Sequence, residues 1–549
     1  MAPPEGWVEY LDTQITELYA GWNIYTTILA IILVAYLFYP GNNSSVPDTH
    51  PLNLASQALQ APVRQPGESA VLRSPETPYG FPLKTGLMVR DEDTPRWALG
   101  RDGDLRDVWK QTVKGAQDRD GQPTGERGRI LTVLGSEEVT EHKLEDISRD
   151  INTLGRHVAE GKRVAIHLPN SVEILTTVLA AAFYKFTPIL IPHEQRLDSL
   201  VSLLQKTQPD VLIAEAGVVP LDELTKAYPN LREVIWVVEK GSRHMGWNEP
   251  NGMKGDVKVS IWHELLDSQR TSASADLPAR VQGEALSNNL VSAVAGLIAS
   301  LPTRHRLSPS DLFLPADSLS QTYTLSLTLA ALYSHASIVF NSVAGPGVDL
   351  GLATRAVAPT VVSISAETAA KAHKNHTEST LTTTSSKWTH YMHTRTLAAG
   401  RMPSSAAASS PTSRPAETAT PGKLRLLLIS ERAQSDAPAL SSSTLSDLRI
   451  FTSARVIYAL TAPRVAGAIA QTQLFDYRLS APGRKSAHSH FGVPLPSVEL
   501  KLVDTPTHKT LDRRDPEGRL VVSGPAVAGG TADLGFTATF KPDLTLAYA

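Results

Sequence analysis

The sequence predicts an α/β protein with parallel sheets, followed by a β-rich subdomain and preceded by one transmembrane helix. Short apolar strands alternate with helical segments between residues 163 and 238, which is typical of a parallel sheet. Two alternating segments, 491–504 and 518–530, are each closed by Gly and Pro turns and indicate the β-rich subdomain. A nearly continuous apolar stretch, residues 22–39, predicts the membrane helix.

The composition is that of a globular protein with two or three domains. The chain has 549 residues, of which 42% are hydrophobic and 19% are charged, and its formal net charge is −3. A net charge this close to zero argues against nucleic acid as the main partner. The chain contains no Cys, which excludes disulfides, thiolate catalysis and Cys-bound zinc.

The apolar stretch separates a short N-terminal tail from a long body. Residues 1–21 contain four acidic residues and no Lys or Arg. Residues 22–39 carry no charge, and a Pro-Gly pair follows them. A buried core helix is the alternative to a membrane span. Because the first cations all follow this stretch, the positive-inside rule places the large C-terminal part in the cytosol. We therefore expect a single-pass protein of the endoplasmic reticulum.

Two other segments lack a sustained hydrophobic period. Residues 41–100 are rich in Pro, Ser and charge, and they predict a tether that is at best partly ordered. Residues 366–422 are dense in Ser, Thr, Ala and Pro, and they predict a low-complexity insert that forms a disordered loop. These segments leave an α/β domain in two parts, 101–365 and 423–549, of which the second contains the β-rich subdomain.

Periodicity predicts the elements of the α/β domain in order. A helical pattern over residues 141–158 places apolar side chains on one face, namely Leu144, Ile147, Ile151, Leu154 and Val158. We expect strands over residues 164–168, 187–192, 211–214, 234–238, 312–315, 337–340, 424–429 and 456–460. We expect helices over residues 172–186, 197–206, 221–227, 290–301, 322–333 and 445–451.

Several of these segments resemble motifs of the adenylate-forming superfamily, which includes acyl-CoA synthetases, luciferases and peptide-synthetase adenylation domains. Segment 491–504 is similar to the pattern G-x-P-x-P-x-x-x-x-K-x-V-D, and 518–530 to G-E-x-x-V-x-G-P-x-V-x-x-G. Segment 163–171 is similar to R-V-A-I-x-L-P-N-S. The resemblance covers residues 105–549 with gaps. It implies an adenylate-forming-type domain and, with the membrane helix, the long-chain fatty acyl-CoA synthetase branch.

The resemblance also implies ATP or AMP and Mg²⁺ as cofactors and a long-chain fatty acid or acyl-CoA as ligand. The family's metal motif, Y-G-x-T-E, corresponds to residues 458–462, where Ala462 replaces the metal-binding carboxylate. Tyr458 and Thr461 remain as candidate cofactor-binding residues, with a packing role as the alternative. The ribose-binding motif, T-G-D-L-G, is similar to residues 531–535. Asp533 is therefore a third candidate, with an ordinary surface turn as the alternative.

Other parts of the family's chemistry have no counterpart. Residues 272–282 lie where a Gly-rich phosphate loop is expected, but they contain no Gly and one cation, Arg280. We expect a lost phosphate loop, with a gene-model error as the alternative. Asn288 stands at a family histidine position. The chain ends at Ala549, where the family's small C-terminal domain with its catalytic Lys begins. We expect that domain to be absent, and we name no catalytic residue and no metal ligand.

These observations support two functions. The first is a membrane-anchored AMP-binding-family protein that resembles a long-chain fatty acid–CoA ligase and has weak or no catalysis. The alternative is a non-catalytic, membrane-tethered pseudoenzyme that binds lipid or acts as a scaffold. Acyl-dependent ATP–pyrophosphate exchange discriminates between them, because only an enzyme forms an acyl-adenylate reversibly.

Overall fold

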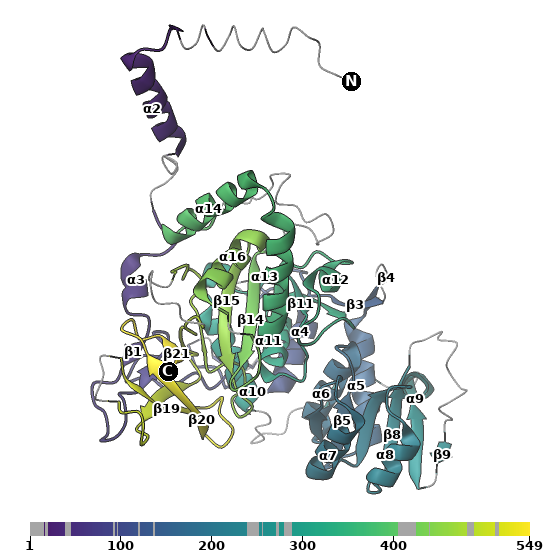
Figure 1. Cartoon of the computed structure of the whole chain (residues 1–549). Coiled ribbons are helices and arrows are strands. Elements are labelled where there is room, and N and C mark those ends of the chain that lie inside the picture. The colour runs from purple at the N-terminus through teal and green to yellow at the C-terminus, as the bar shows by residue number, and fades with distance from the viewer. Residues whose placement is uncertain are drawn as a thin grey trace, which may run out of the picture. The chain divides into compact units, whose positions relative to one another are not determined.

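A computed structural model describes the chain as two units, residues 1–48 and 49–549 (Figure 1). The described residues are 16, 20–38, 46–91, 94–95, 97–118, 121–134, 138–238, 252–254, 256–270, 274–278, 288–403, 424–438, 440–479, 488–510 and 515–549.

The first unit contains helix α2, Ile24–Phe38, which lies inside the stretch expected to span a membrane. Its N-terminus is capped by Asn23, whose Oδ1 accepts hydrogen bonds from the N–H groups of Tyr25 and Thr26 at 2.9 and 3.1 Å. The helix has 15 residues. Within the described part of the chain, none of the helices is both long enough and apolar enough to cross a membrane.

A six-stranded sheet forms the first α/β region of the second unit. Its strand order is β6–β5–β7–β8–β10–β9, and every pair except β10–β9 is parallel. The strands are β5 Arg163–His167, β6 Thr187–Leu190, β7 Val211–Glu215, β8 Glu233–Val237, β9 Gly252–Lys254 and β10 Val257–Ile261. The helices of this region are α5 Leu144–Val158, α6 Val172–Tyr184, α7 Leu197–Thr207, α8 Leu221–Ala227 and α9 Trp262–Arg270. The predicted parallel sheet is confirmed.

A nine-stranded sheet forms the centre of the unit, in the order β17–β16–β15–β14–β13–β11–β12–β3–β4. Neighbouring strands from β15 to β3 are all paired in parallel. The strands are β3 Ile130–Leu134, β4 Glu138–His142, β11 Leu312–Pro315, β12 Ser337–Asn341, β13 Val361–Ser365, β14 Leu426–Arg432, β15 Arg455–Thr461, β16 Ala470–Gln471 and β17 Val493–Pro494. The helices are α4 Leu105–Lys114, α10 Asn288–Ser300, η1 Thr303–His305, α11 Thr322–Tyr333, α12 Leu350–Thr354 and α16 Ser442–Thr452.

The β-rich subdomain is an antiparallel sheet of six strands in the order β1–β2–β18–β19–β20–β21. Its C-terminal strands are β18 Glu499–Val503, β19 Glu517–Ser523, β20 Thr531–Phe540 and β21 Leu546–Tyr548. The prediction from segments 491–504 and 518–530 is therefore confirmed. Strand β18 buries every second side chain, as expected for a sheet with one covered face, whereas β19 buries three consecutive residues, 520–522.

Within the expected tether, residues 41–100, the described part from residue 49 to residue 91 is instead folded and contributes to this sheet. It supplies helix α3, Pro51–Ala55, and strands β1, Leu59–Gln60, and β2, Leu72–Arg73. Leu72 is 1% exposed and pairs with Leu500 of β18. Two-residue strands are too short to produce a visible period in the sequence, so their partners in a distant segment determine them.

The expected disordered insert, residues 366–422, contains two helices, α13 Ala366–Thr380 and α14 Thr384–Ala398. Ser365 and Thr383 cap their N-termini through side-chain hydrogen bonds to backbone N–H groups. The Ala residues that gave the segment its low-complexity appearance are good helix formers, and α13 packs against β13, β14 and α16. The prediction is therefore wrong for both helices, and residues 404–423 lie outside the described residues.

A smaller correction concerns residues 138–142. The helical pattern was expected to begin at residue 141, but β4 occupies Glu138–His142 and α5 begins at Leu144. All five apolar residues of the predicted face are buried. The helix is therefore confirmed, and its start is displaced because the antiparallel pairing with β3 takes the preceding residues.

Candidate functional site

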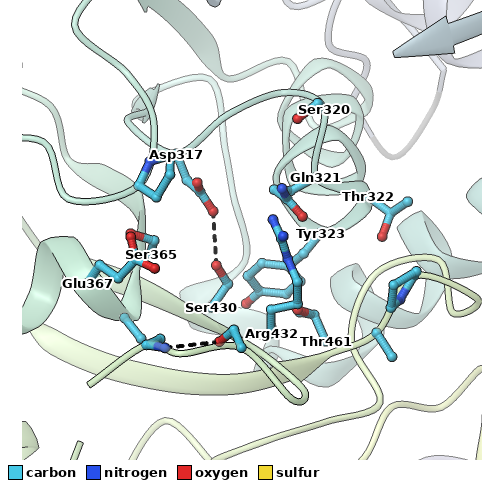
Figure 2. A pocket seen from close by; sticks show the side chains of 16 residues that line it. Asp317, Ser320, Gln321, Thr322, Tyr323, Ser365, Glu367, Ser430, Arg432 and Thr461 are labelled. Atoms are coloured by element: carbon cyan, nitrogen blue, oxygen red, sulfur yellow. Dashed lines mark hydrogen bonds between the residues drawn. The ribbon is translucent and has the colours of Figure 1, made fainter. Parts of the chain in front are cut away.

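A pocket opens at the carboxyl ends of four parallel strands, β11, β13, β14 and β15, which is where ligands bind in α/β sheets (Figure 2). Its volume is about 330 Å³. We call it the polar pocket, and its lining is Asp317, 320–323, Pro346, 365–367, Ser430, Arg432, Ser435, Ala437 and 461–463.

Two helices begin at the polar pocket. Residues 320–323 include the first turn of α11, whose N-cap residue, Gln321, makes no side-chain capping bond. Residues 365–367 include the start of α13, where the Ser365 hydroxyl accepts a hydrogen bond from the N–H of Thr368 at 3.2 Å. Helix N-termini carry partial positive charge, so this arrangement favours an anionic or acceptor-rich ligand group.

Asp317 follows β11 and is almost completely buried, at 3% exposure. Its Oδ1 accepts a hydrogen bond from the N–H of Ser318 at 2.8 Å. Its Oδ2 accepts one from the Ser430 hydroxyl at 3.0 Å, as Figure 2 shows, and a longer one from the Thr324 hydroxyl at 3.4 Å. Burial raises the pKa of Asp317, and the hydrogen bonds from Ser318 and Ser430 oppose that shift without cancelling it. The carboxyl group therefore retains its proton more readily than an exposed Asp.

Tyr323 contributes a buried hydroxyl to the lining. The residue is 1% exposed, and its hydroxyl has no hydrogen-bond partner among the residues that the structure describes. Burial raises the pKa of this group, so the hydroxyl keeps its proton at any physiological pH. Because buried polar groups are nearly always satisfied, this hydroxyl is a candidate donor for a ligand group.

The three residues singled out from the sequence lie in different surroundings. Thr461 lines the polar pocket, and its hydroxyl donates a hydrogen bond to the carbonyl oxygen of Glu431 at 3.0 Å. Tyr458 is fully buried, its hydroxyl donates to the Glu431 carboxylate, and its ring centroid lies 4.9 Å from that of Phe491. Three residues apart on a strand, these two side chains point to opposite faces of the sheet. Tyr458 therefore packs behind the pocket.

Asp533 lies on β20 of the antiparallel sheet and is absent from the pocket lining. Its Oδ2 forms an ion pair with Nε of Arg519 at 3.0 Å, and both side chains are about half exposed. Its Oδ1 accepts a hydrogen bond from the N–H of Gly535 at 3.0 Å. The structure thus brings Thr461 to the pocket, and it places Asp533 on the surface of the hairpin.

The side chains around Ala462 do not fit a magnesium ion. Ala462 lines the pocket with a methyl group, which offers the metal no oxygen. Asp317 is already engaged by three donors, and Glu367 is then the remaining carboxylate of the lining. Among the described residues, no group of three or more His, Asp or Glu residues could hold a metal ion. No step of a reaction is therefore assigned to a metal here.

The segment expected to replace the phosphate loop is described only over residues 274–278. Asn152 of α5 donates hydrogen bonds to the carbonyl oxygens of Ser274 and Asp276, at 2.6 and 2.9 Å. Asp276 is exposed, and its N–H and carboxylate both bond to the Ser274 hydroxyl. The segment is thus fixed to α5 in this part, while Arg280 lies outside the described residues.

A second pocket adjoins the first and has mostly apolar walls. We call it the apolar pocket; its volume is about 390 Å³, and its lining is Leu105, Val178, 181–182, 185–188, Leu190, 289–290, Thr322, Leu325, 463–464, Ala466, Ala526 and Ala528. Thr322 and Pro463 line both pockets. Two cations, Lys185 and Arg464, also line the apolar pocket. The pair of pockets can therefore hold a ligand with a polar end and an apolar end.

Comparison with solved structures finds the same fold. A long-chain-fatty-acid–CoA ligase from Archaeoglobus fulgidus is 14% identical, with a TM-score of 0.53 and coverage of 85% of this chain and 86% of that one. A benzoate CoA ligase from Burkholderia xenovorans LB400 is 13% identical, with a TM-score of 0.53 and coverage of 81% and 80%. The luciferase-like enzyme of the mealworm Zophobas morio is 11% identical, with a TM-score of 0.53 and coverage of 81% and 93%. At these identities the likeness concerns the fold alone.

A search of curated protein sequences found no match. The sequence does match a family model. The model described as AMP-binding enzyme matches residues 145–531, which is more than half of the chain. The match includes the strands and helices that form the polar pocket. This chain therefore belongs to the AMP-binding enzyme family.

Proposed function

We propose that this chain is a membrane-anchored member of the AMP-binding family that resembles a long-chain fatty acid–CoA ligase, binds a fatty acid or acyl derivative, and adenylates it weakly or not at all. The observation that carries the proposal is Ala462. It lines the polar pocket where the family motif has a carboxylate, so Mg²⁺-dependent ATP binding loses a ligand there.

The two adjoining pockets support an amphipathic ligand. The polar pocket offers the N-terminus of α11 and the Tyr323 hydroxyl to a carboxylate or ester oxygen. The apolar pocket, with Val178, Phe186 and Leu190 in its walls, suits an acyl chain. The printed name of the Archaeoglobus fulgidus structure supports the substrate class, because it is a long-chain-fatty-acid–CoA ligase.

Helix α2 supports the membrane anchor. Its 15 residues are uncharged and predominantly apolar, and the acidic tail precedes it while the cations follow. A long acyl chain partitions into bilayers, so a protein that binds one gains from being held at the bilayer surface. We place the second unit in the cytosol and the anchor in the endoplasmic reticulum.

The test uses the full-length protein in detergent or bilayer discs and measures ligand binding and chemistry separately. Titration calorimetry with a long-chain fatty acid and with a non-hydrolysable acyl-adenylate analogue measures binding. Acyl-dependent ATP–pyrophosphate exchange measures adenylation. We expect binding of the fatty acid together with exchange that is weak or undetectable. Robust exchange would overturn the loss of catalysis, and absence of binding by both compounds would favour a scaffold.

Two Tyr→Phe variants test whether the fatty acid binds in the polar pocket. Tyr323→Phe removes the buried hydroxyl and keeps the ring, and we expect about tenfold weaker binding of the acid. Tyr333→Phe is the control, because Tyr333 is on the same helix but lines neither pocket. Equal affinities in the two variants would remove the polar pocket from the proposal.

A further inference from the structure

Helix α14 presents an exposed face of aromatic and cationic side chains. Lys387, Trp388, Tyr391 and Arg395 follow helical spacing and are exposed. Trp388 and Tyr391 are each 50% exposed, and their ring centroids lie 5.8 Å apart. The helix contains no Asp or Glu, so these cations have no acidic neighbour on their own helix. A solvent-facing helix in a globular protein more often mixes both signs of charge with polar residues.

The opposite face of α14 holds the helix in a fixed orientation. Leu397 is 1% exposed and packs in a cluster with Ile450 and Tyr477. The ring centroid of His390 lies 5.5 Å from that of Phe451 on α16. Because these contacts bury one side of the helix, the aromatic and cationic side is held outward.

The chain enters the second unit beside this helix. The carbonyl oxygen of Leu54 accepts a hydrogen bond from Nη1 of Arg478 at 3.1 Å, and Nε2 of Gln57 donates to Oδ2 of Asp476 at 2.7 Å. Tyr477, between those two partners, packs against Leu397 of α14. Figure 1 shows α3 and α14 on the same side of the unit. The entry segment and α14 therefore share one side of the structure.

Only ten residues, 39–48, connect α2 to the second unit. An extended chain of that length spans roughly 35 Å at most. If α2 is anchored in a bilayer, the entry side of the second unit stays near the bilayer surface. Helix α14 is on that side.

We propose that the face formed by Lys387, Trp388, Tyr391 and Arg395, which we call the α14 face, docks onto an anionic lipid surface. Trp and Tyr are the residues that favour the membrane interface, because their rings combine apolar and polar parts. Lys and Arg are attracted to anionic headgroups, and each contributes roughly fivefold to binding near the surface. The proposal rests on the membrane anchor proposed above, and it adds a second point of attachment that fixes the orientation of the unit.

The test exploits the absence of Cys from the chain, since one introduced Cys gives one labelled position. An environment-sensitive fluorophore is attached at Ala398→Cys, at the exposed end of α14. The matched control is Ala227→Cys, at the exposed end of α8. A third probe, Ile28→Cys, reports on α2. Each full-length protein is reconstituted into phosphatidylcholine vesicles with and without phosphatidylserine, and quenching by lipids with brominated acyl chains is measured.

We expect quenching at position 398 that requires phosphatidylserine and falls with salt, and none at position 227. Replacing Lys387 and Arg395 together by Ala should lower the ratio of docked to undocked protein about 30-fold. The same replacement at Lys206 and Lys226, exposed on α7 and α8, should leave it unchanged. Trp388→Ala should weaken docking onto the vesicles that contain phosphatidylserine, and this loss should depend less on salt than the loss from the Lys387 and Arg395 replacements. Circular dichroism shows whether each variant is folded.

The outcomes separate docking from anchoring. Quenching at 28 without quenching at 398 overturns docking and leaves the anchor standing. Quenching at 398 without quenching at 28 supports docking and overturns the anchor. Absence of quenching at both positions overturns both proposals. A fluorescence shift at 398 that depends on protein concentration, without quenching by brominated lipid, assigns the face to a second copy of the chain and overturns docking to lipid.

Discussion

His373 of α13 lies with its Nε2 2.9 Å from Oδ2 of Asp447 on α16. The other carboxylate oxygen of Asp447 lies 3.1 Å from Nε2 of His390 on α14. One carboxylate thus connects both helices of the insert to the body of the second unit. The Phe451 ring of α16 lies beside both histidines, with its centroid 6.1 Å from that of His373 and 5.5 Å from that of His390.

The Asp447 connection predicts a pH-dependent stability. Burial would raise the pKa of Asp447, but the hydrogen bonds with His373 and His390 outweigh it and hold the pKa below its usual range. A carboxylate with a lowered pKa in the folded state stabilises it at neutral pH and loses this effect as the pH falls through the folded-state value. Asp447→Asn should therefore lower the free energy of unfolding by about 1 kcal/mol at neutral pH and by less in acid.

Urea unfolding of the wild type and of Asp447→Asn, at neutral pH and at a pH well below the pKa of an ordinary Asp, measures this difference. Asp436→Asn is the control, because Asp436 is exposed on the loop after β14. It should change the free energy of unfolding by less than about 0.5 kcal/mol at either pH. A difference for Asp447→Asn that stays constant between the two conditions would contradict the proposed connection.

The environment of Glu431 predicts that stability changes with pH in the opposite direction. Burial raises its pKa to about 7, although a hydrogen bond with Tyr548 lowers it in part. The folded state then binds a proton more tightly than the unfolded chain, so stability is greatest below the ordinary pKa of Glu and falls as the pH rises toward 7. The full effect is roughly 3 kcal/mol. Glu431→Gln, which resembles the protonated acid, should abolish the decline.

The measurement for Glu431 is the free energy of unfolding between about pH 5 and pH 8. Tyr458 donates to this carboxylate, so Tyr458→Phe should lower stability at every pH in the range. A wild-type protein that is equally stable across the range, or a Gln variant with the same slope, would show that Glu431 is not the titrating group.

At Gly155 we expect side-chain packing to have a larger effect on stability than helix propensity. It lies inside α5, where Ala is favoured over Gly by about 1 kcal/mol. A Cβ at this position would lie 2.0 Å from Cδ2 of Tyr184, whose hydroxyl donates to Oδ1 of Asn152 at 2.8 Å. Forcing this ring aside costs about 1–3 kcal/mol, so Gly155→Ala should destabilise the protein by roughly 1 kcal/mol. When Tyr184 is replaced by Ala, the added methyl group of Gly155→Ala no longer meets the ring, so the Gly155 substitution should become stabilising. Thermal unfolding of the wild type, the two single variants and the double variant measures this coupling.

The sequence predicts the long helices and strands of the fold, but not the two-residue strands that depend on a distant partner. Helices α8 and α11 coincide with the predicted ranges, although α11 is buried on all sides and has no apolar stripe of helical spacing. Strands β1 and β2 were missed because distant pairing with β18 determines them. The helices of the insert are not evident from composition, because the Ser and Thr caps that begin them stand in a segment already rich in Ser and Thr.

The candidate site was predictable only where a residue follows a strand. Asp317 comes directly after the strand predicted at 312–315, so the rule for the carboxyl ends of parallel strands could have identified it. Ser430 and Arg432 lie beyond the predicted end of their strand at 429, and β14 extends through both. Tyr458 was expected beside a ligand on the basis of a motif, but strand alternation places it behind Thr461.

Asp311 and Asp317, at the two ends of β11, predict opposite responses to the same substitution. Asp311 is 4% exposed and accepts two hydrogen bonds of 2.7 Å from Arg425, which outweigh burial and lower its pKa. Asp311→Asn leaves the guanidinium without its charged partner and should cost about 3 kcal/mol. Asp317 makes no ion pair with a cation among the described residues, and burial raises its pKa despite the nearby charge of Arg432, so an amide replaces it at a cost of about 1 kcal/mol or less. Urea unfolding at neutral pH measures both values. A larger loss for Asp317→Asn would mean that its carboxylate is charged in the folded state and pairs with Arg432 across the pocket.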